Sequence, residues 1–238
     1  MQSLSFCRGD RRALDGVSTV VPSSGLTCLI GTNGAGKTTL LRILSGELRP
    51  TSGTFKIGEI DAAKATQRVI SRCFSIVPQK SPAPAYLTVA EMIALGRFRS
   101  RGALWWRLNQ ADRDRIDEAV RLCELKDFVD RKVTELSGGE QQRVWVAFAI
   151  ASDKPFLLLD ETFDGMDVIA KRGFFQLVKT ISVRDRSVIL ATHDLNMVSE
   201  YADKVVVLSR GRVVYDGDTG ADFKSHLSTP GTSIPARS

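Results

Sequence analysis

A glycine-rich segment narrows the folds open to this 238-residue chain more than any other stretch of its sequence. It is Gly31-Thr32-Asn33-Gly34-Ala35-Gly36-Lys37-Thr38, which satisfies the pattern G-x-x-x-x-G-K-[ST]. The apolar run before it, at residues 25–30, has the length of a buried strand. A helical pattern follows from Lys37 and ends at Ser45-Gly46, where a C-cap glycine is expected. A strand, a glycine-rich loop and a helix in this order predict a phosphate-binding loop.

Such a loop binds phosphates because its glycines permit a tight turn that directs successive backbone N–H groups at phosphate oxygens. The start of the following helix adds positive potential. We expect Lys37 to reach the β- and γ-phosphates and Thr38 to bind Mg²⁺, with Thr39 assigned to the same site. The alternative, a glycine turn without a ligand, leaves the strand before the loop and the helix after it unexplained. The segment therefore predicts a nucleoside triphosphate site.

A second apolar run, at residues 156–159, ends in two adjacent carboxylates, Asp160 and Glu161. Carboxylates at strand ends are often solvated turn residues, so alone they carry little weight. Beside a phosphate loop they gain a role, because the ligands of a parallel sheet gather at the carboxyl ends of its strands. We expect Asp160 to hold Mg²⁺ and Glu161 to polarise the attacking water.

The segment Leu136-Ser137-Gly138-Gly139-Glu140 contains a second helix start that is suited to an anion. Ser137 is a good N-cap, two glycines follow, and the helical pattern continues to about Ala151. Two such helix ends on opposite sides of one subunit cannot reach the same γ-phosphate. A two-fold dimer allows it, because each site then takes one helix end from each chain. The sequence thus predicts a homodimer formed through its nucleotide sites.

With these three segments the chain resembles the nucleotide-binding subunit of an ATP-binding cassette (ABC) transporter, over about residues 1–222. Val77-Pro78-Gln79 matches the family's Q-loop, Asp164-Gly165-Met166-Asp167 loosely matches its D-loop, and Ala191-Thr192-His193-Asp194 matches its switch histidine. The resemblance implies ATP and Mg²⁺ as ligands and ATP hydrolysis as the activity. It also implies that Gln79 senses Mg²⁺ or the lytic water and couples the site to a membrane-spanning partner.

The resemblance assigns roles to further residues. Ser137, Gly138 and Gly139 would hold the γ-phosphate of the ATP on the opposing subunit, and Glu140 is assigned to the same cofactor-binding segment. Asp167 would communicate between the two sites. His193 would hold the γ-phosphate and the Glu161 carboxylate in register. A histidine after a strand is more often structural, but the position of His193 downstream of Asp160 favours the functional assignment.

Three positions depart from the family pattern. Thr162-Phe163 follow Glu161 where a proline and a small polar residue are usual, so the backbone there is expected to relax more freely. Arg8 stands about where an aromatic residue normally stacks on adenine, and a guanidinium plane can stack on a base too. Thr32 replaces a common proline, with no expected effect.

The remaining apolar runs indicate the fold class. Residues 74–77, 187–190 and 205–208 are almost wholly apolar, as strands covered on both faces are. No strand-like run occurs between residues 88 and 153, where a capping box at Thr88 and helical spacing at residues 110–123 indicate helices. We predict an α/β fold with a P-loop NTPase core of mainly parallel sheet, flanking helices and an N-terminal antiparallel β region. The expected parts are the core at residues 1–87 and 154–222, an inserted α-helical subdomain at 88–153 and a mobile tail at 223–238.

Composition limits the other classes of function. The four cysteines form no C-x-x-C pair and only two histidines occur, so neither a disulfide framework nor a histidine zinc site is expected. No apolar run approaches the roughly 20 residues of a spanning helix, and no signal peptide is visible. The net charge of +6 is compatible with several anionic partners.

A basic and aromatic stretch contains Arg97, Arg99, Arg101 and Arg107 among Phe98, Trp105 and Trp106. It is suited to a permease or an anionic membrane leaflet, or it is a solvated basic face over a buried tryptophan. Nucleic acid is not an expected partner, because no nucleic-acid-binding module accompanies the stretch.

Fainter similarities concern the transported substrate. Segments at residues 94–98, 107–113, 143–147, 193–195 and 200–203 resemble importers of metal ions or iron chelates, including siderophore, haem and cobalamin systems. The resemblance implies a permease partner, an indirect link to a solute-binding protein and a peripheral position at the cytoplasmic face of the cell membrane. Generic cassette helices would explain these segments as well. A soluble ABC-type ATPase that acts as a scaffold or clamp, in iron–sulfur assembly or DNA maintenance, is the alternative function.

Overall fold

The structure, a computed structural model, describes residues 1–79, 84–97, 108–163, 166–183, 186–220 and 223–227. These ranges contain both strands and helices, with three α-helices between residues 77 and 156, and the strands at the two ends of the chain pair antiparallel with a neighbour. No helix among the described residues is long and apolar enough to cross a bilayer.

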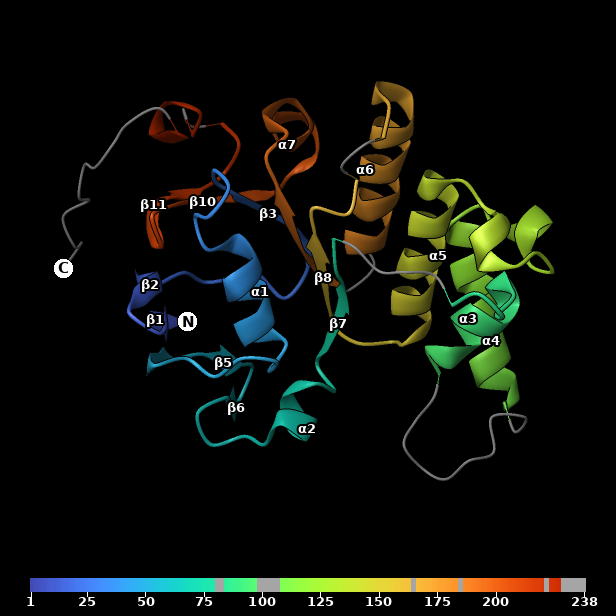
Figure 1. The fold of residues 1–238 in the computed structure, drawn as a ribbon, viewed down its shortest axis with the longest axis horizontal. Coiled ribbons are helices and arrows are strands. Elements are labelled where there is room, and N and C mark those ends of the chain that lie inside the picture. The colour runs from blue at the N-terminus through green and yellow to red at the C-terminus, as the bar shows by residue number, and fades with distance from the viewer. Residues whose placement is uncertain (80–83, 98–107, 164–165, 184–185, 221–222, 228–238) are drawn as a thin grey trace.

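A six-stranded sheet forms the centre of the molecule (Figure 1). Its strand order is β11-β10-β3-β9-β8-β7, and every pair is parallel except β10 with the edge strand β11. The strands are β3 (Gly25–Ile30), β7 (Phe74–Val77), β8 (Phe156–Asp160), β9 (Ser187–Thr192), β10 (Lys204–Ser209) and β11 (Arg212–Gly217). The strands predicted from apolar runs and the mainly parallel sheet are confirmed.

Both faces of this sheet are buried, which explains why its strands are almost wholly apolar. In β3, Leu26 and Cys28 point into one core cluster and Leu29 into the other, as the two-residue period of a strand requires. The first face is covered by α6 (Val168–Ser182) and α7 (Leu195–Tyr201). The second is covered by α1 (Lys37–Leu44) and the short helix α2 (Gln67–Ile70).

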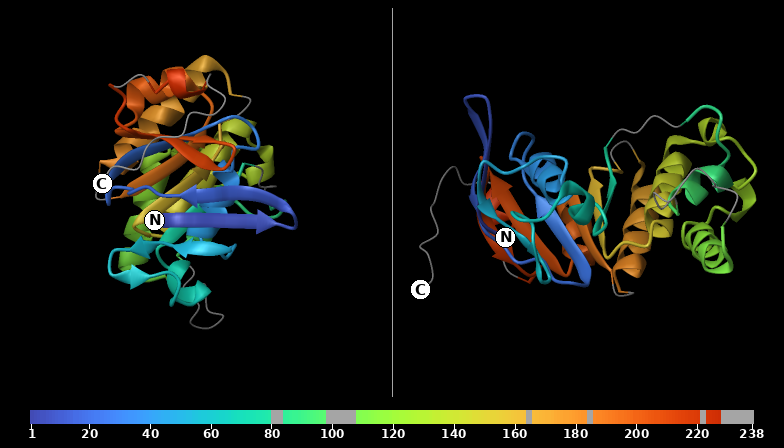
Figure 2. Two further views of the ribbon diagram at one scale, coloured as in Figure 1. Left: turned by 90° about the vertical axis from the view of Figure 1, so that its left-hand side faces the viewer. Right: turned by 90° about the horizontal axis from the view of Figure 1, so that it is seen from below.

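Small antiparallel sheets stand on the α1 side, as predicted for the N-terminal region. The hairpin of β1 (Gln2–Arg8) and β2 (Arg11–Val17) joins β4 (Ser52–Thr54) in a three-stranded sheet, and β5 (Lys56–Ile57) pairs with β6 (Ile60–Asp61). The core end of the hairpin is anchored by buried Leu4 and Leu14, and its turn projects from one end of the molecule (Figure 2).

Among the described residues, three α-helices lie at the opposite end, between β7 and β8 in the sequence (Figures 1 and 2). They are α3 (Val89–Leu95), α4 (Gln110–Leu122) and α5 (Gly138–Ala151). Helix α5 contacts both α3 and α4 and also β7, so its apolar C-terminal half joins the helical segment to the sheet. Helix α3 begins with the capping box predicted at Thr88, and α5 begins at the predicted N-cap Ser137, which forms a capping box with Glu140. The short 3₁₀ helices η1 (Lys126–Phe128) and η2 (Val133–Glu135) lead into α5.

Two sequence predictions need correction. The tail cannot start at residue 223, because Phe223 is only 2% exposed and packs beside Tyr215, before the 3₁₀ helix η3 (Ser225–Leu227). Arg97 is not part of a solvated face, since its buried guanidinium donates to Asp112 and to the Ala151 carbonyl oxygen, both at 2.8 Å. Residues 98–107 of the basic stretch and residues 228–238 of the tail lie outside the described residues.

Candidate functional site

The phosphate loop runs from β3 to α1, and two of its glycines are required by close packing. A Cβ atom on Gly31 would lie 2.4 Å from the Leu208 carbonyl oxygen in β10, so the neighbouring strand excludes a side chain there. Gly36 has φ +110°, which only glycine adopts readily, and its Cβ position is 2.7 Å from the Ala13 carbonyl oxygen in β2. The adjoining strands thus fix the course of the loop.

Lys37, the first residue of α1, is buried with its charge compensated inside the loop. Its ammonium donates to the Gly31 carbonyl oxygen at 2.7 Å and to that of Thr32 at 3.4 Å. It also lies 3.1 Å from Glu161 Oε1. The lysine therefore connects the phosphate loop to the carboxylate that follows β8.

Glu161 follows β8 in an unusual backbone conformation. Its φ of +47° lies in the left-handed region, which costs free energy for a residue with a side chain. The conformation is held by a hydrogen bond from its N–H to the Ala191 carbonyl oxygen of β9, at 3.0 Å. Besides pairing with Lys37, the carboxylate accepts a hydrogen bond from Gln79 Nε2 at 2.9 Å. Neighbouring strands and both partners thus hold Glu161 against the phosphate loop.

Asp160 ends β8 with a carboxyl group that is 5% exposed, and it accepts a hydrogen bond from the Thr38 hydroxyl at 3.2 Å. Burial raises the pKa of Asp160, and the adjacent Glu161 raises it further against the opposing effect of Thr38. A nearby cation would favour the ionised form. One carboxylate and one hydroxyl form the sparse oxygen set that Mg²⁺ takes from a protein when phosphates and water complete its shell. Thr38 and Asp160 therefore fit Mg²⁺. The described residues include no group of three or more His, Cys, Asp or Glu side chains that could hold a metal ion.

A cavity of about 420 Å³ opens over the loop. The predicted site residues that line it are Asn33, Gly34, Ala35, Gly36, Lys37, Thr38, Thr39, Arg8, Gln79 and Glu161. Two further lining residues, Arg11 and Ala13 of β2, are absent from the sequence prediction. The sequence gives little signal for them, because they reach the cavity only through the fold of the hairpin, in which Arg8 pairs with Arg11.

Gly31, Thr32 and Asp160 contact lining residues of this cavity, whereas the predicted residues at the starts of α5 and α6 do not line it. Ser137, Gly138, Gly139 and Glu140 begin α5, on the opposite face of the sheet from α1 (Figure 1). Asp167 is the N-cap of α6, where its carboxylate accepts a backbone N–H at 2.9 Å. Asp164 and Gly165 of the predicted D-loop lie outside the described residues.

The start of α5 is stabilised internally and open outwards. The Glu140 carboxylate accepts hydrogen bonds from the Ser137 hydroxyl and from its backbone N–H, both at 2.7 Å, and these bonds lower the pKa of Glu140. A Cβ atom on Gly138 or Gly139 would meet nothing within 4 Å. Packing in the described part of the chain therefore gives no reason for two glycines, and the helix end is accessible to a ligand or a second subunit.

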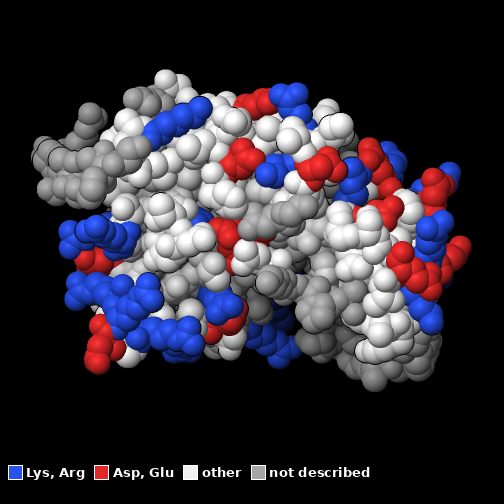
Figure 3. Space-filling model, turned by 45° about the horizontal axis from the view of Figure 1, so that its top comes forward, with Lys and Arg blue, Asp and Glu red and all other residues white. Residues whose placement is uncertain are grey.

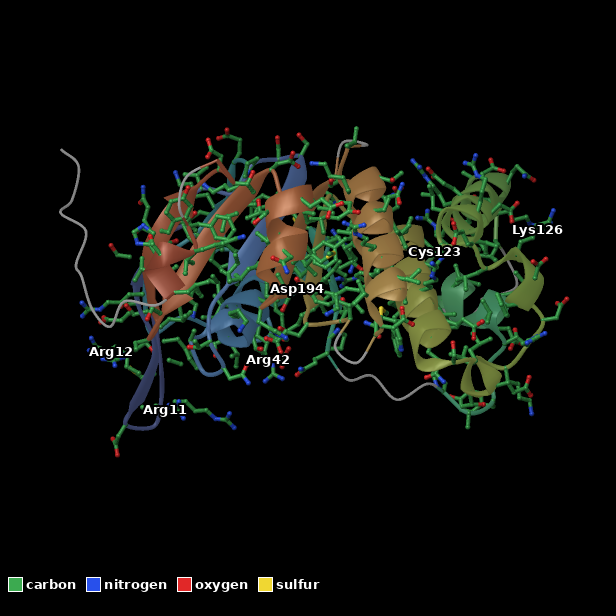
Figure 4. All side chains as sticks on the ribbon, turned by 90° about the horizontal axis from the view of Figure 1, so that it is seen from above. Arg11, Arg12, Arg42, Cys123, Lys126 and Asp194 are labelled. Carbon is green, nitrogen blue, oxygen red and sulfur yellow. The ribbon has the colours of Figure 1, made fainter. Side chains whose placement is uncertain are left out.

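His193 follows β9 at the same edge of the sheet and is exposed. Its neighbour Asp194 fixes the local backbone, because its N–H donates to Thr192 Oγ1 at 2.9 Å and its carboxylate caps α7 at the Met197 N–H. The carboxylate also pairs with Lys171 of α6 at 3.0 Å (Figure 4 labels Asp194). Burial raises the pKa of Asp194, but the hydrogen bonds from Lys171 and the backbone outweigh it and the pKa is lowered.

The segment after Glu161 is anchored differently from the usual family pattern. Phe163 is 1% exposed and packs beside Phe174 and Phe175 of α6, with ring centroids 5.9 and 5.0 Å away. Thr162 is buried as well, and its hydroxyl has no hydrogen-bond partner among the described residues. An aromatic cluster thus restrains the backbone where the family has proline, contrary to the freer backbone expected from the sequence.

A second cavity, of about 430 Å³, lies at the amino ends of β8 and β9, at the other end of the strands from Glu161. Its charged groups compensate one another: Arg186 contacts Asp153 at 3.2 Å, and Arg115 contacts Glu118 at 3.0 Å. Arg115 of α4 also lies 3.6 Å from Asp153, which joins α4 to the core. No residue of the phosphate loop lines this cavity.

Comparison with known proteins agrees with this geometry. The sequence pattern of the ABC transporter family matches residues 14–164. The probable siderophore transport system ATP-binding protein YusV of Bacillus subtilis is 31% identical over 91% of this chain and 78% of its own length. The hemin import ATP-binding protein HmuV of Rhodococcus jostii is 34% identical over 95% of this chain and 76% of its own.

Among solved structures, the dimeric bacterial ABC transporter cassette MJ0796 superimposes with a TM-score of 0.79 at 27% identity. The match covers 92% of this chain and 97% of that one. The fold and the sequence of the chain therefore both match ABC transporter proteins.

Proposed function

The chain belongs to the ABC transporter family of ATPases, and from this we propose that it is the ATP-binding and ATP-hydrolysing subunit of an importer. The importer would take up a metal ion or an iron chelate of the siderophore, haem or cobalamin type through a separate permease. Support for this substrate class comes from relatives named for siderophore transport and hemin import. A solute-binding protein would act indirectly, and the subunit would lie peripherally at the cytoplasmic face of the membrane.

The observation that carries the proposal is the convergence of Lys37, Glu161 and Gln79 on one cavity above the phosphate loop. The backbone N–H groups of the loop and the Lys37 ammonium would bind the β- and γ-phosphates of ATP. Glu161 would then exchange its contact with Lys37 for the attacking water, whose proton it would accept. Gln79 would orient that water or contact the metal, and would connect the site to the permease.

Mg²⁺ would bind between the phosphates and the oxygens of Thr38 and Asp160, with Gln79 as a further contact. When bound, the ion neutralises the charge that develops on the phosphate oxygens. Asp160 is buried and lies beside the loop hydroxyl, so this chain offers the ion an anionic oxygen without a large rearrangement.

The complete site would need a second copy of the chain. Ser137, Gly138 and Gly139 lie on the opposite face of the sheet from α1 and leave the start of α5 open. In a two-fold dimer they would contact the γ-phosphate bound by the partner, with Glu140 holding Ser137. Asp167 and His193 would complete the link between the two sites. Closure on ATP and reopening after hydrolysis would drive the permease, because ATP and ADP differ in affinity for the closed dimer.

Replacing Glu161 with glutamine tests the catalytic assignment. The amide keeps the hydrogen-bonding shape but cannot accept the proton of water, so we expect ATP binding to persist while turnover falls at least 100-fold. Glu59→Gln at an exposed position remote from the cavity makes the same charge change and should leave turnover unchanged. Phosphate release and nucleotide binding are measured on all three proteins.

Hydrolysis by Glu161→Gln at a rate near that of the parent would contradict the role of Glu161. Association with a permease is tested separately, by isolating the chain from membranes of its native host. A polytopic membrane protein in the complex supports transport, whereas a purely soluble complex would support a scaffold or clamp instead.

A further inference from the structure

The nucleotide cavity has a wall that the phosphate-loop pattern does not account for. The β1–β2 hairpin contributes Arg8 and Arg11, which lie opposite each other in the antiparallel pair. Like charges at directly paired positions of a sheet are destabilising. No carboxylate of the described residues pairs with either guanidinium. Positive side chains gather at this end of the molecule, on the left in Figure 3.

The Arg11 side chain lies next to Gly34 of the phosphate loop. Its Nη2 atom is 3.5 Å from the position that a Cβ atom of Gly34 would occupy, and Gly34 has φ +80°. The loop's backbone N–H groups are those that cradle phosphate oxygens. A guanidinium at this distance from the loop is therefore within reach of the phosphates that the loop would hold.

The neighbouring arginine behaves differently. Arg12 donates to Asp15 Oδ1 at 2.8 Å, and Arg212 of β11 binds the other oxygen of the same carboxylate. Figure 4 shows the Arg11 and Arg12 side chains leaving the hairpin on opposite sides. Arg12 does not line the cavity. One of two adjacent exposed arginines thus has its charge compensated, and the other is directed at the loop.

We propose that Arg11 is a phosphate-binding residue of the nucleotide site, contacting the triphosphate from the hairpin side opposite Lys37. This inference rests on the proposed ATPase function and adds a residue to its site. A guanidinium presents several N–H donors in a planar fork that matches phosphate oxygens and remains charged at every working pH. An anion bound in the cavity beside both side chains would also offset the repulsion between Arg11 and Arg8. Because this contact is with phosphate oxygens and not with the base, it would form with any nucleoside triphosphate.

The test compares Arg11→Gln with Arg12→Gln, two variants with the same charge change on adjacent exposed residues. Affinity is measured by calorimetry for ATP, GTP and inorganic tripolyphosphate, which has no base. We expect Arg11→Gln to weaken all three by a similar factor, roughly 5- to 20-fold at low salt and less at high salt. Arg12→Gln should bind all three like the parent.

Two results would overturn the proposal. Equal binding by Arg11→Gln and Arg12→Gln would show that Arg11 makes no contact that its neighbour does not. A loss confined to ATP and GTP, with tripolyphosphate unaffected, would move the contact from phosphate to base or ribose. Failure of the parent protein to bind ATP would instead contradict the proposed function, and Lys37→Met, which removes the loop cation, provides the reference for lost binding.

Discussion

Lys37 and Glu161 form a charged pair between the first residue of α1 and the residue that follows β8. Each limits the conformation of the other: the lysine is 4% exposed, and the glutamate is held in a left-handed backbone conformation. Nucleotide binding would replace this pair with lysine–phosphate and glutamate–water contacts. Without nucleotide, the Glu161 carboxylate therefore occupies the anionic position next to Lys37 that a phosphate would take in the complex.

Glycines Gly31 and Gly138, one from each anion-binding segment, differ in whether the surrounding structure has room for a side chain. Gly31→Ala would force a Cβ atom to within 2.4 Å of a backbone oxygen, and we expect a loss of about 2 kcal/mol or more in unfolding free energy. Gly138→Ala meets open space at the first position of α5, where alanine is a good helix residue. Its unfolding free energy should be unchanged or slightly higher. Equilibrium urea unfolding without nucleotide measures both.

Equal losses in the two variants would show that Gly138 also has a packing role, in disagreement with the open helix end. A stable Gly138→Ala variant with reduced turnover would support a role for that glycine in contacting the partner subunit.

Among the elements, α6 makes two similar ion pairs, one with the residue that precedes α7 and one with a residue between α7 and β10. Lys171 binds Asp194, next to His193, while Lys179, two turns further along α6, binds Asp203. Lys171→Met and Lys179→Met each remove one cation from a partly exposed pair. Both should cost about 1 kcal/mol or less in stability. Only Lys171→Met should also reduce ATP turnover, by several fold, because only Asp194 lies beside His193.

The pH dependence of these pairs has a definite sign. The pKa values of Asp194 and Asp203 are both lowered from 3.8, so the pairs contribute stability above that pH and lose it as the pH falls through the lowered values. The stability difference between each variant and the parent should therefore shrink between pH 7 and about pH 3. Urea unfolding across this range and a turnover assay at pH 7 provide the measurements. Equal turnover in both variants would contradict the positioning role of Lys171.

Strand and helix positions were predictable here because burial leaves a direct record in the sequence. The parallel strands are covered on both faces, so β8 and β10 are continuous apolar runs, and the N-cap residue Ser137 marks the start of α5. The role of Arg11 was not predictable, because it depends on the register of β1 with β2 and on the packing of that hairpin against the loop. The burial of Phe223 depends likewise on a distant contact with Tyr215.

The candidate site was predictable to the extent that its motifs are continuous in sequence. The loop residues, Asp160 and Glu161 were found because phosphate and metal chemistry requires them at fixed spacing. The contact between Gln79 and Glu161 joins residues 82 positions apart, and Phe163 anchors the segment after Glu161 by packing against the aromatic rings of α6. Neither can be derived from spacing alone.

At the scale of the whole molecule, the two anion-binding helix ends lie on opposite faces of one sheet. Helix α1 packs in the core cluster on one face and α5 in the cluster on the other, with β3, β8 and β9 between them. One subunit cannot bring both to a single phosphate without refolding. A shared site between two copies is the arrangement that uses both ends.

The most direct test is the mass of Glu161→Gln in solution, measured by sedimentation velocity with and without ATP and Mg²⁺. We predict a species of twice the 26.1 kDa chain mass with ATP, and the single chain without nucleotide. Adding Ser137→Arg, which places a bulky cation at the open helix end, should abolish the ATP-dependent dimer while leaving ATP binding in place. A single-chain mass at saturating ATP, or a dimer that forms equally well without nucleotide and survives Ser137→Arg, would contradict the account.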